Sequence, residues 1–237
     1  MLDYFELNAA GEPAALMLWL HGLGADGRDL EPVAGMLALG QVRHVFPHAP
    51  VRPVTINRGL AMRAWFDIAA ADLRWQEDRA GILESARQVQ ELASALRGES
   101  GLPVVLAGFS QGAVVSLAAA SLGVPGLCGV AALSGYVPEF LRPALAGLQT
   151  RVFMAHGEQD EVVPYVLGRA GCDALKEGGL EVEWRGYAMP HGLAGRIARA
   201  GLTRMARRPA PARFFLALGP RAEAPAWSVL ARPKPAG

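Results

Sequence analysis

One serine of this sequence has neighbours that would make it a nucleophile. Ser110 is the middle residue of Gly108–Gly112, a Gly-x-Ser-x-Gly pattern. The apolar run Leu102–Ala107 before it is typical of a buried strand, and the small residues Ala113–Ala120 after it favour a helix. A sharp turn between a strand and a helix lifts a serine hydroxyl to the N-terminus of that helix. The pattern therefore predicts a nucleophile elbow at Ser110.

A serine hydroxyl is a weak nucleophile until a neutral imidazole takes its proton and a carboxylate orients that imidazole. Two loops downstream of the serine supply both groups in the order Ser, Asp, His. We predict Asp160 as the acid because it ends a turn after a predicted strand and precedes the apolar residues that anchor the next element, with Glu158 and Glu161 as alternatives. His191 is the only histidine that follows Asp160, so it is the predicted base.

The other four histidines are expected to have structural roles. His156 ends a predicted strand, where it would brace the loop that carries the acid. His21 lies in a glycine loop ahead of the serine, and His44 and His48 lie around the second predicted strand. None of the four follows the acid in the chain, so the order of the three groups argues against each of them as the base.

Attack on a carbonyl also requires N–H groups that stabilise the negative charge developing on its oxygen. One donor is expected from Gln111, the residue after the nucleophile. The other is expected from the loop after the early strand, where the glycine-rich segment His21–Gly24 gives the backbone the necessary freedom, and we select Leu23. Removal of one such donor typically costs about 3–4 kcal/mol of transition-state stabilisation.

Apolar strand patterns alternate with helical patterns along the chain, which predicts an α/β fold with a mostly parallel sheet. In such sheets, ligands bind at the carboxyl ends of the strands, where the candidate residues fall. The clearest helix has an apolar stripe at helical spacing. The predicted strands are Ala15–Leu20, Val42–Phe46, Leu102–Ala107, Gly126–Leu133, Thr150–Ala155 and Leu180–Arg185, and the predicted helices are Asp78–Arg97 and Tyr165–Glu177.

Length and composition favour one domain over two small ones. The chain has 237 residues, of which 51% are hydrophobic, enough for a large core. No apolar run is long enough to cross a bilayer, and the first residues lack a signal-peptide pattern. Cys128 and Cys172 are the only cysteines, so we expect reduced thiols and a cytoplasmic protein. No cysteine and histidine cluster has metal-ligand spacing, so no metal site is expected.

The charge of the chain is unevenly distributed. The net charge is +1, but residues 192–237 contain nine Lys or Arg residues and one acidic residue, Glu223. A basic segment can bind nucleic acid or anionic lipid. This segment is rich in Ala, Pro and Arg and lacks the aromatic interleaving that single-strand binders use, so we predict no nucleic-acid binding.

Several motifs in the same order resemble the phospholipase/carboxylesterase family, which includes bacterial carboxylesterases and acyl-protein thioesterases. The resemblance covers residues 14–191 and implies an α/β-hydrolase fold, a three-layer sandwich that needs no cofactor. The family's triad falls on Ser110, Asp160 and His191, its oxyanion donors on Leu23 and Gln111, and an acyl-pocket position on Trp65. The motifs are His21–Gly27, Pro47–Pro50, Met62–Asp67, Gly108–Gly112, Leu133–Tyr136 and His156–Pro164.

The resemblance ends near His191. In the family a glycine precedes the catalytic histidine and a mostly acidic helix follows it, whereas here Pro190 precedes and an arginine-rich segment follows. We therefore divide the chain into a hydrolase domain, residues 1–191, and an atypical basic tail, residues 192–237. Two hypotheses account for the tail: a genuine extension, or a shift of the reading frame near His191, which we favour because the composition changes abruptly.

The resemblance implies a serine carboxylic-ester hydrolase that forms an acyl-enzyme. The apolar residues Leu23, Trp65, Phe66 and Ile68 indicate esters of short-to-medium acyl groups. Acyl-protein thioesterase or lysophospholipase activity is an alternative, and an inactive hydrolase-fold binding protein is another. The expected partner is a small acyl ester or thioester, without nucleic acid or integral membrane contact, and a homodimer is left open.

Overall fold

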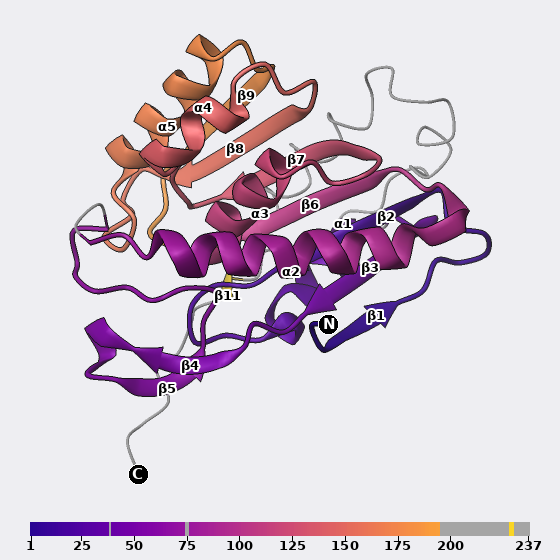
Figure 1. Cartoon of the computed structure of the whole chain (residues 1–237), viewed down its shortest axis with the longest axis horizontal. Coiled ribbons are helices and arrows are strands. Elements are labelled where there is room, and N and C mark those ends of the chain that lie inside the picture. Colours follow the sequence, from indigo (N-terminus) through magenta and orange to yellow (C-terminus); the bar gives the residue numbers. More distant parts are fainter. Residues whose placement is uncertain (38, 74–75, 195–227, 230–237) are drawn as a thin grey trace.

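A computed structural model describes residues 1–37, 39–73, 76–194 and 228–229. Its centre is a seven-stranded sheet in the order β1-β3-β2-β6-β7-β8-β9, in which only β1 runs antiparallel to its neighbour (Figure 1). The sheet strands are β1 (Tyr4–Leu7), β2 (Ala15–Leu20), β3 (Val42–Pro47), β6 (Val104–Phe109), β7 (Leu127–Leu133), β8 (Arg151–Gly157) and β9 (Val182–Tyr187), and the helices are α1 (Glu31–Leu37), α2 (Arg79–Arg97), α3 (Gln111–Ser121), α4 (Arg142–Leu145) and α5 (Tyr165–Glu177).

Both faces of the sheet are covered, which explains why its central strands are apolar throughout. All six residues of β2 are buried. Because side chains alternate along a strand, Leu16, Leu18 and Leu20 enter a core that also contains apolar residues of α2, α3 and α5. Met17 and Trp19 point to the opposite face and join a core with α1. The α/β three-layer arrangement is confirmed.

The predicted elements of the sheet match the observed ones closely. The strand Ala15–Leu20 and the helix Tyr165–Glu177 have the predicted bounds. Helix α2 begins one residue later than predicted because Asp78 caps it, accepting a hydrogen bond from the Gly81 N–H at 2.9 Å. Strands β6, β8 and β9 each extend two residues further toward the C-terminus than predicted.

Helix α1 and three strands of the first 63 residues were not predicted. Strand β1 has only four residues, and it pairs with β3 at the sheet edge. The proline-rich loop after β3 contains the start of an antiparallel hairpin of β4 (Val51–Val54) and β5 (Leu60–Arg63). Short edge strands carry a weak periodic signal, which explains why sequence patterns missed them.

Little of the basic tail lies within the described residues. Strand β10 (Leu193–Ala194) pairs antiparallel with β11 (Ser228–Val229). The rest of the proposed tail, residues 195–227 and 230–237, lies outside the described part of the chain. The domain boundary and both hypotheses for the tail therefore remain predictions. Among the described helices, none is both long and apolar enough to cross a membrane.

Candidate active site

Ser110 lies in the turn between β6 and α3, in a backbone conformation that residues other than glycine rarely adopt. Its φ is +56° and its ψ is −116°, and its N–H donates to the Leu133 carbonyl at 2.9 Å. The flanking glycines allow the close packing that this turn needs: a Cβ on Gly108 would overlap the Gly112 carbonyl, and one on Gly112 would overlap the Leu20 carbonyl. A strained residue held by packed neighbours is frequent at functional sites.

Asp160 lies in the connection between β8 and α5, with a side chain that is fully buried. Its Oδ1 accepts hydrogen bonds from the Val162 N–H at 2.9 Å and the Val163 N–H at 2.7 Å. Burial alone would raise the pKa of this carboxyl, but hydrogen bonds from His156 and His191 hold the pKa well below its usual range. Asp160 is therefore ionised at neutral pH.

His191 lies against this carboxylate. Its Nδ1 is 2.7 Å from Asp160 Oδ2, and its side chain is 16% exposed. Because the carboxylate can only accept, Nδ1 carries the hydrogen and Nε2 of the neutral ring keeps a lone pair. Asp160 thus selects the tautomer that a general base needs. The alternatives Glu158 and Glu161 are exposed.

The loops of the acid and the base are joined through their backbones. The Glu158 N–H donates to the Tyr187 carbonyl at 2.8 Å, and the Gln159 N–H donates to the Met189 carbonyl at 3.1 Å. A Cβ on Gly157 would overlap the Met189 carbonyl, so a glycine is needed where the loops meet. The structure therefore fixes the separation between acid and base even though they are 31 residues apart in the sequence.

The imidazole of His191 also reaches the elbow. Its ring centroid lies 4.9 Å from that of Phe109, the residue before the serine. Within the described residues, the Ser110 hydroxyl and His191 do not form a hydrogen bond. Catalytic hydrogen bonds of ligand-free enzymes are often long and tighten only when substrate binds. The structure thus brings Ser110, Asp160 and His191 to one end of the sheet.

The two proposed oxyanion donors flank the elbow. A Cβ on Gly22, the residue before Leu23, would lie 3.5 Å from Ser110 Cβ, so this loop touches the nucleophile. Gln111 is the first residue of α3, and the first N–H groups of a helix have no acceptor within it. Among the described residues, the N–H groups of Leu23 and Gln111 donate to no protein acceptor.

The side chain of Gln111 connects the elbow to the segment before α2. Its Oε1 accepts from the Trp65 N–H at 3.1 Å, and its Nε2 donates to the Phe66 carbonyl at 2.8 Å. The Trp65 indole N–H in turn donates to the His21 carbonyl at 2.8 Å. These buried hydrogen bonds connect the glycine loop that contains Leu23 with the start of α3 at Gln111. Sequence reasoning considered only the backbone N–H of Gln111 and missed its amide.

His21 completes this network in its neutral form. Burial lowers the pKa of His21 to about 4, despite a hydrogen bond to the Gly22 carbonyl. The carbonyl lies 2.7 Å from Nδ1, and Nε2 accepts from the Ala49 N–H at 3.0 Å, which fixes the hydrogen on Nδ1. His21 has the structural role expected of it.

His44 and His48 are likewise structural. His44 is buried and accepts from the Trp19 indole N–H at 3.0 Å, and burial lowers its pKa to about 4. His48 accepts from the Gly27 N–H at 3.2 Å. Neither histidine contacts the predicted triad through any hydrogen bond of the described residues.

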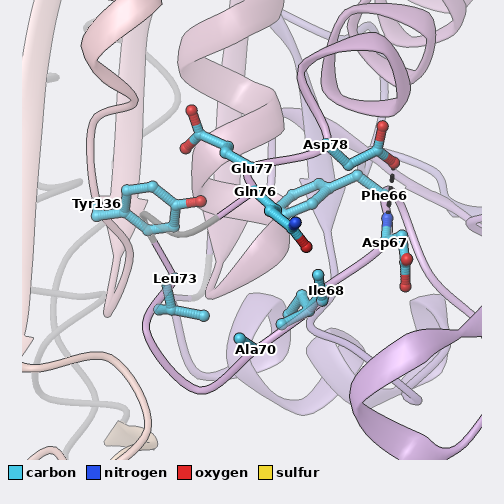
Figure 2. A pocket seen from close by; sticks show the side chains of 10 residues that line it. Phe66, Asp67, Ile68, Ala70, Leu73, Gln76, Glu77, Asp78 and Tyr136 are labelled. Carbon is cyan, nitrogen blue, oxygen red and sulfur yellow. Dashed lines mark hydrogen bonds between the residues drawn. The ribbon is translucent and has the colours of Figure 1, made fainter.

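A small pocket lies beside the segment that follows Trp65, and none of its lining residues belongs to the elbow or to the predicted triad (Figure 2). One wall comes from the segment held by Gln111, and another from Tyr136, which follows β7. The hydroxyl end of Tyr136 points into the pocket, and the carboxyl of Glu77 lies beside it. The lining residues are Phe66, Asp67, Ile68, Ala69, Ala70, Leu73, Gln76, Glu77, Asp78 and Tyr136.

Trp65 itself is not among the lining residues of this pocket. Its side chain is fully buried, and its ring packs 5.3 Å from that of His21. Its contacts are those of a support for the oxyanion loop. The acyl contact assigned to Trp65 from the family resemblance remains a prediction, and the neighbouring Phe66 lines the pocket.

The donor set of the site consists of a serine, an imidazole and one carboxylate. Within the described residues, no group of three or more His, Cys, Asp or Glu side chains could hold a metal ion. The arrangement is suited to proton transfer and nucleophilic attack by a side chain.

The phospholipase/carboxylesterase family model matches residues 4–200. The chain belongs to the phospholipase/carboxylesterase family. It is an enzyme, a serine hydrolase of the carboxylesterase type, and its family acts on acyl esters and thioesters. The predicted resemblance and the α/β-hydrolase fold are both confirmed.

Individual relatives agree with this membership. The chain is 39% identical over 207 residues to acyl-protein thioesterase 1 of Mycosarcoma maydis, covering 76% of this chain and 85% of the relative. The crystal structure of Arabidopsis thaliana SOBER1 superimposes with a TM-score of 0.74 at 30% identity, covering 81% of this chain and 98% of that chain. For Zea mays acyl-protein thioesterase 2 the TM-score is 0.75 at 26% identity, with 86% and 99% covered.

Proposed function

We propose that this hydrolase cleaves acyl thioesters through an acyl-enzyme on Ser110, and that it also accepts carboxylic esters. The single observation that carries the proposal is the hydrogen bond from His191 to the ionised Asp160 at 2.7 Å, next to a serine in an elbow turn. The names of several relatives, acyl-protein thioesterase 1, favour thioesters over simple esters as the main substrates.

In the proposed mechanism, His191 Nε2 accepts the Ser110 proton as the serine oxygen attacks the acyl carbon. The resulting imidazolium keeps the hydrogen on Nδ1, which donates to Asp160. It gives the Nε2 proton to the leaving thiolate or alkoxide. Water then attacks the acyl-enzyme while His191 Nε2 takes a proton from it. The imidazolium returns this proton to the Ser110 oxygen, which releases the acid and restores the serine. No step consumes a cofactor.

The proposed oxyanion donors are the N–H groups of Leu23 and Gln111. Both are free of protein acceptors among the described residues, and the Gln111–Trp65–His21 network holds their segments in place. Donors fixed before the reaction stabilise developing charge without a cost of reorganisation.

We expect an acyl group of short-to-medium length, because apolar residues lie beside the elbow. Leu23 follows Gly22, which packs against Ser110, and the Phe66 carbonyl accepts from the Gln111 amide. We therefore expect kcat/KM to rise as the acyl chain lengthens from two carbons, and to level off when the chain outgrows these apolar residues.

The proposal is tested with acyl thioesters and p-nitrophenyl esters of two to eight carbons, together with a fluorophosphonate probe. Wild-type enzyme is expected to be labelled on Ser110, as located by mass spectrometry of the peptides. Ser110→Ala should lose both labelling and at least about 10⁴-fold in kcat. Turnover by Ser110→Ala at the wild-type rate would overturn the assigned nucleophile, and an unlabelled wild-type protein would favour a hydrolase-fold binding protein.

A lysophospholipase is the second candidate, since the family name includes phospholipases. A panel that adds lysophosphatidylcholine to the thioesters separates the two activities. A cytoplasmic location and a homodimer remain predictions, as does the absence of nucleic-acid binding, because most of the basic tail lies outside the described residues.

A further inference from the structure

A second histidine lies on the oxygen of Asp160 that faces His191. His156 Nε2 is 3.3 Å from Asp160 Oδ2 and 2.8 Å from the Val163 carbonyl. The carbonyl can only accept, so Nε2 must carry the hydrogen, which it shares between two oxygens. Two imidazole N–H groups therefore converge on one carboxylate oxygen.

The same imidazole also fixes the loop that carries the acid. His156 binds the carbonyl of Val163, and the N–H of Val163 binds Asp160 Oδ1 at 2.7 Å. Both carboxylate oxygens thus depend on His156, one directly and one through the backbone of Val163. A rotation of the carboxylate would break contacts on both sides.

His156 itself has little freedom to move. It is 1% exposed, and its ring stacks on Trp184 with a centroid distance of 6.0 Å and meets the edge of Tyr165 at the same distance. A Cβ on Gly168 of α5 would overlap Nδ1, so only a glycine lets the helix approach the ring this closely. His156 also lies near the end of β8, where the pairing of the strands holds its backbone in place.

We propose that His156 is a positioning residue of the triad. Its N–H holds the Asp160 carboxylate with Oδ2 toward His191, and it takes up part of the negative charge of that oxygen. His156 thereby keeps the carboxylate in the orientation in which Oδ2 accepts from His191 Nδ1. This inference rests on the proposed function.

Few other charges face the two histidines. In β9, a Cβ on Gly186 would lie 2.8 Å from both Glu158 Oε1 and the Tyr165 hydroxyl, so these two groups lie close to each other. Arg169 of α5 lies over that ring at 5.8 Å. From β6, His191 meets only the uncharged Phe109 ring. Asp160 is the one carboxylate in hydrogen-bond contact with either histidine among the described residues.

The test compares His156→Met with His156→Gln, two side chains of similar size of which only glutamine has an N–H donor. For the methionine variant we expect kcat/KM at the plateau to fall about 5- to 20-fold with KM within about 2-fold. Glutamine should restore most of this loss, because its N–H₂ can still donate to the Asp160 carboxylate.

Tyr165→Phe is the matched control for packing. It removes the hydrogen bond from the Trp184 indole N–H at 3.3 Å and touches His156 only through the ring edge. We expect an unchanged kcat/KM. A methionine variant that folds and keeps the wild-type kcat/KM would overturn the inference, as would a glutamine variant that restores none of the loss or a control variant that loses the same factor.

A second measurement needs no substitution at position 156. In the wild-type protein with ¹⁵N-labelled histidine, NMR should find His156 as the tautomer with hydrogen on Nε2. A hydrogen on Nδ1 would overturn the inference, because a lone pair would then face Asp160. Fluorophosphonate labelling of the same sample keeps the two proposals apart: an unlabelled Ser110 contradicts the proposed function, whereas a labelled Ser110 with the other tautomer contradicts only the role of His156.

Discussion

The two sides of the candidate site are held by different kinds of interaction. On the acid–base side, an ionised carboxylate organises two histidines and two backbone N–H groups. On the oxyanion side, the network of Gln111, Trp65 and His21 consists of neutral groups, including an imidazole whose pKa burial lowers to about 4. Proton transfer requires a group that titrates, whereas charge stabilisation requires a fixed geometry.

This difference predicts that the two sides respond differently to substitution and to pH. Disruption of the acid–base side should remove the proton acceptor in its active form. Disruption of the oxyanion side should leave the proton transfer intact but misplace the donors. We therefore expect larger losses in kcat from the first side than from the second.

The largest effect is expected from Asp160→Asn. The amide N–H₂ would face His191 Nδ1 and favour the wrong imidazole tautomer, so kcat should fall about 10³- to 10⁴-fold with little change in KM. Steady-state kinetics with an octanoyl thioester measures both constants. Activity within 10-fold of wild type would remove Asp160 from the triad, and Glu158→Gln serves as the control on the same loop.

A smaller effect is expected from Gln111→Ala, which keeps the backbone N–H but loses both side-chain hydrogen bonds. The segment of Trp65 and Phe66 would shift, and a misplacement of about 1 Å can cost about 10²-fold in rate. We expect a loss of about 10- to 100-fold in kcat over the whole pH range, with the limbs of the profile unmoved.

Trp65→Phe tests the same network further from the elbow. It leaves the buried His21 carbonyl without its donor, which costs about 1–3 kcal/mol of stability. Its loss in kcat should be smaller than that of Gln111→Ala. An equal loss in both variants would place the essential link at the indole, and an unchanged kcat in both would remove the network from catalysis.

The smallest effect concerns stability at mildly acidic pH. His21 and His44 have folded-state pKa values of about 4, below the unfolded value of 6.5, so the unfolded chain binds more protons between these values. The free energy of unfolding should therefore fall as the pH decreases from about 6.5 to about 4. At pH 5 each histidine should cost about 2 kcal/mol relative to pH 7.

Urea unfolding followed by circular dichroism at pH 7, 6 and 5 measures this effect. His44→Asn is the useful comparison, because of these two buried imidazoles only that of His44 lies outside the site. Its free energy of unfolding should vary less with pH than that of the wild type. A pH dependence that is identical in both proteins would contradict the role of His44.

Sequence reasoning succeeded where side-chain types and strand periodicity carry the information. The pattern around Ser110 predicted a strand, a turn and a helix. The glycines on either side of the serine are needed because a larger residue there would overlap the neighbouring backbone. Chain order alone paired Asp160 with His191, and the structure brings these two to 2.7 Å. Central strands such as β2 were found because burial on both faces makes them apolar throughout.

It was less successful where function depends on backbone contacts or on residues distant in the chain. The amide of Gln111 bridges to residues 45 and 46 positions away, which no local pattern can indicate. The pocket residues Glu77 and Tyr136 come from the segment before α2 and the turn after β7, which lie far apart in the chain. His156 was expected to brace the acid loop, but its contact with the carboxylate itself needed coordinates.

The positive φ of Ser110 has a consequence for the evolution of this enzyme. A non-glycine residue in such a conformation costs about 1–3 kcal/mol, which a glycine would largely recover. The protein without its nucleophile, Ser110→Gly, is therefore expected to melt at a higher temperature than the active enzyme. Selection for fold robustness alone would erase the hydroxyl, so a lineage that retains serine at this position must still be under pressure to turn over substrate.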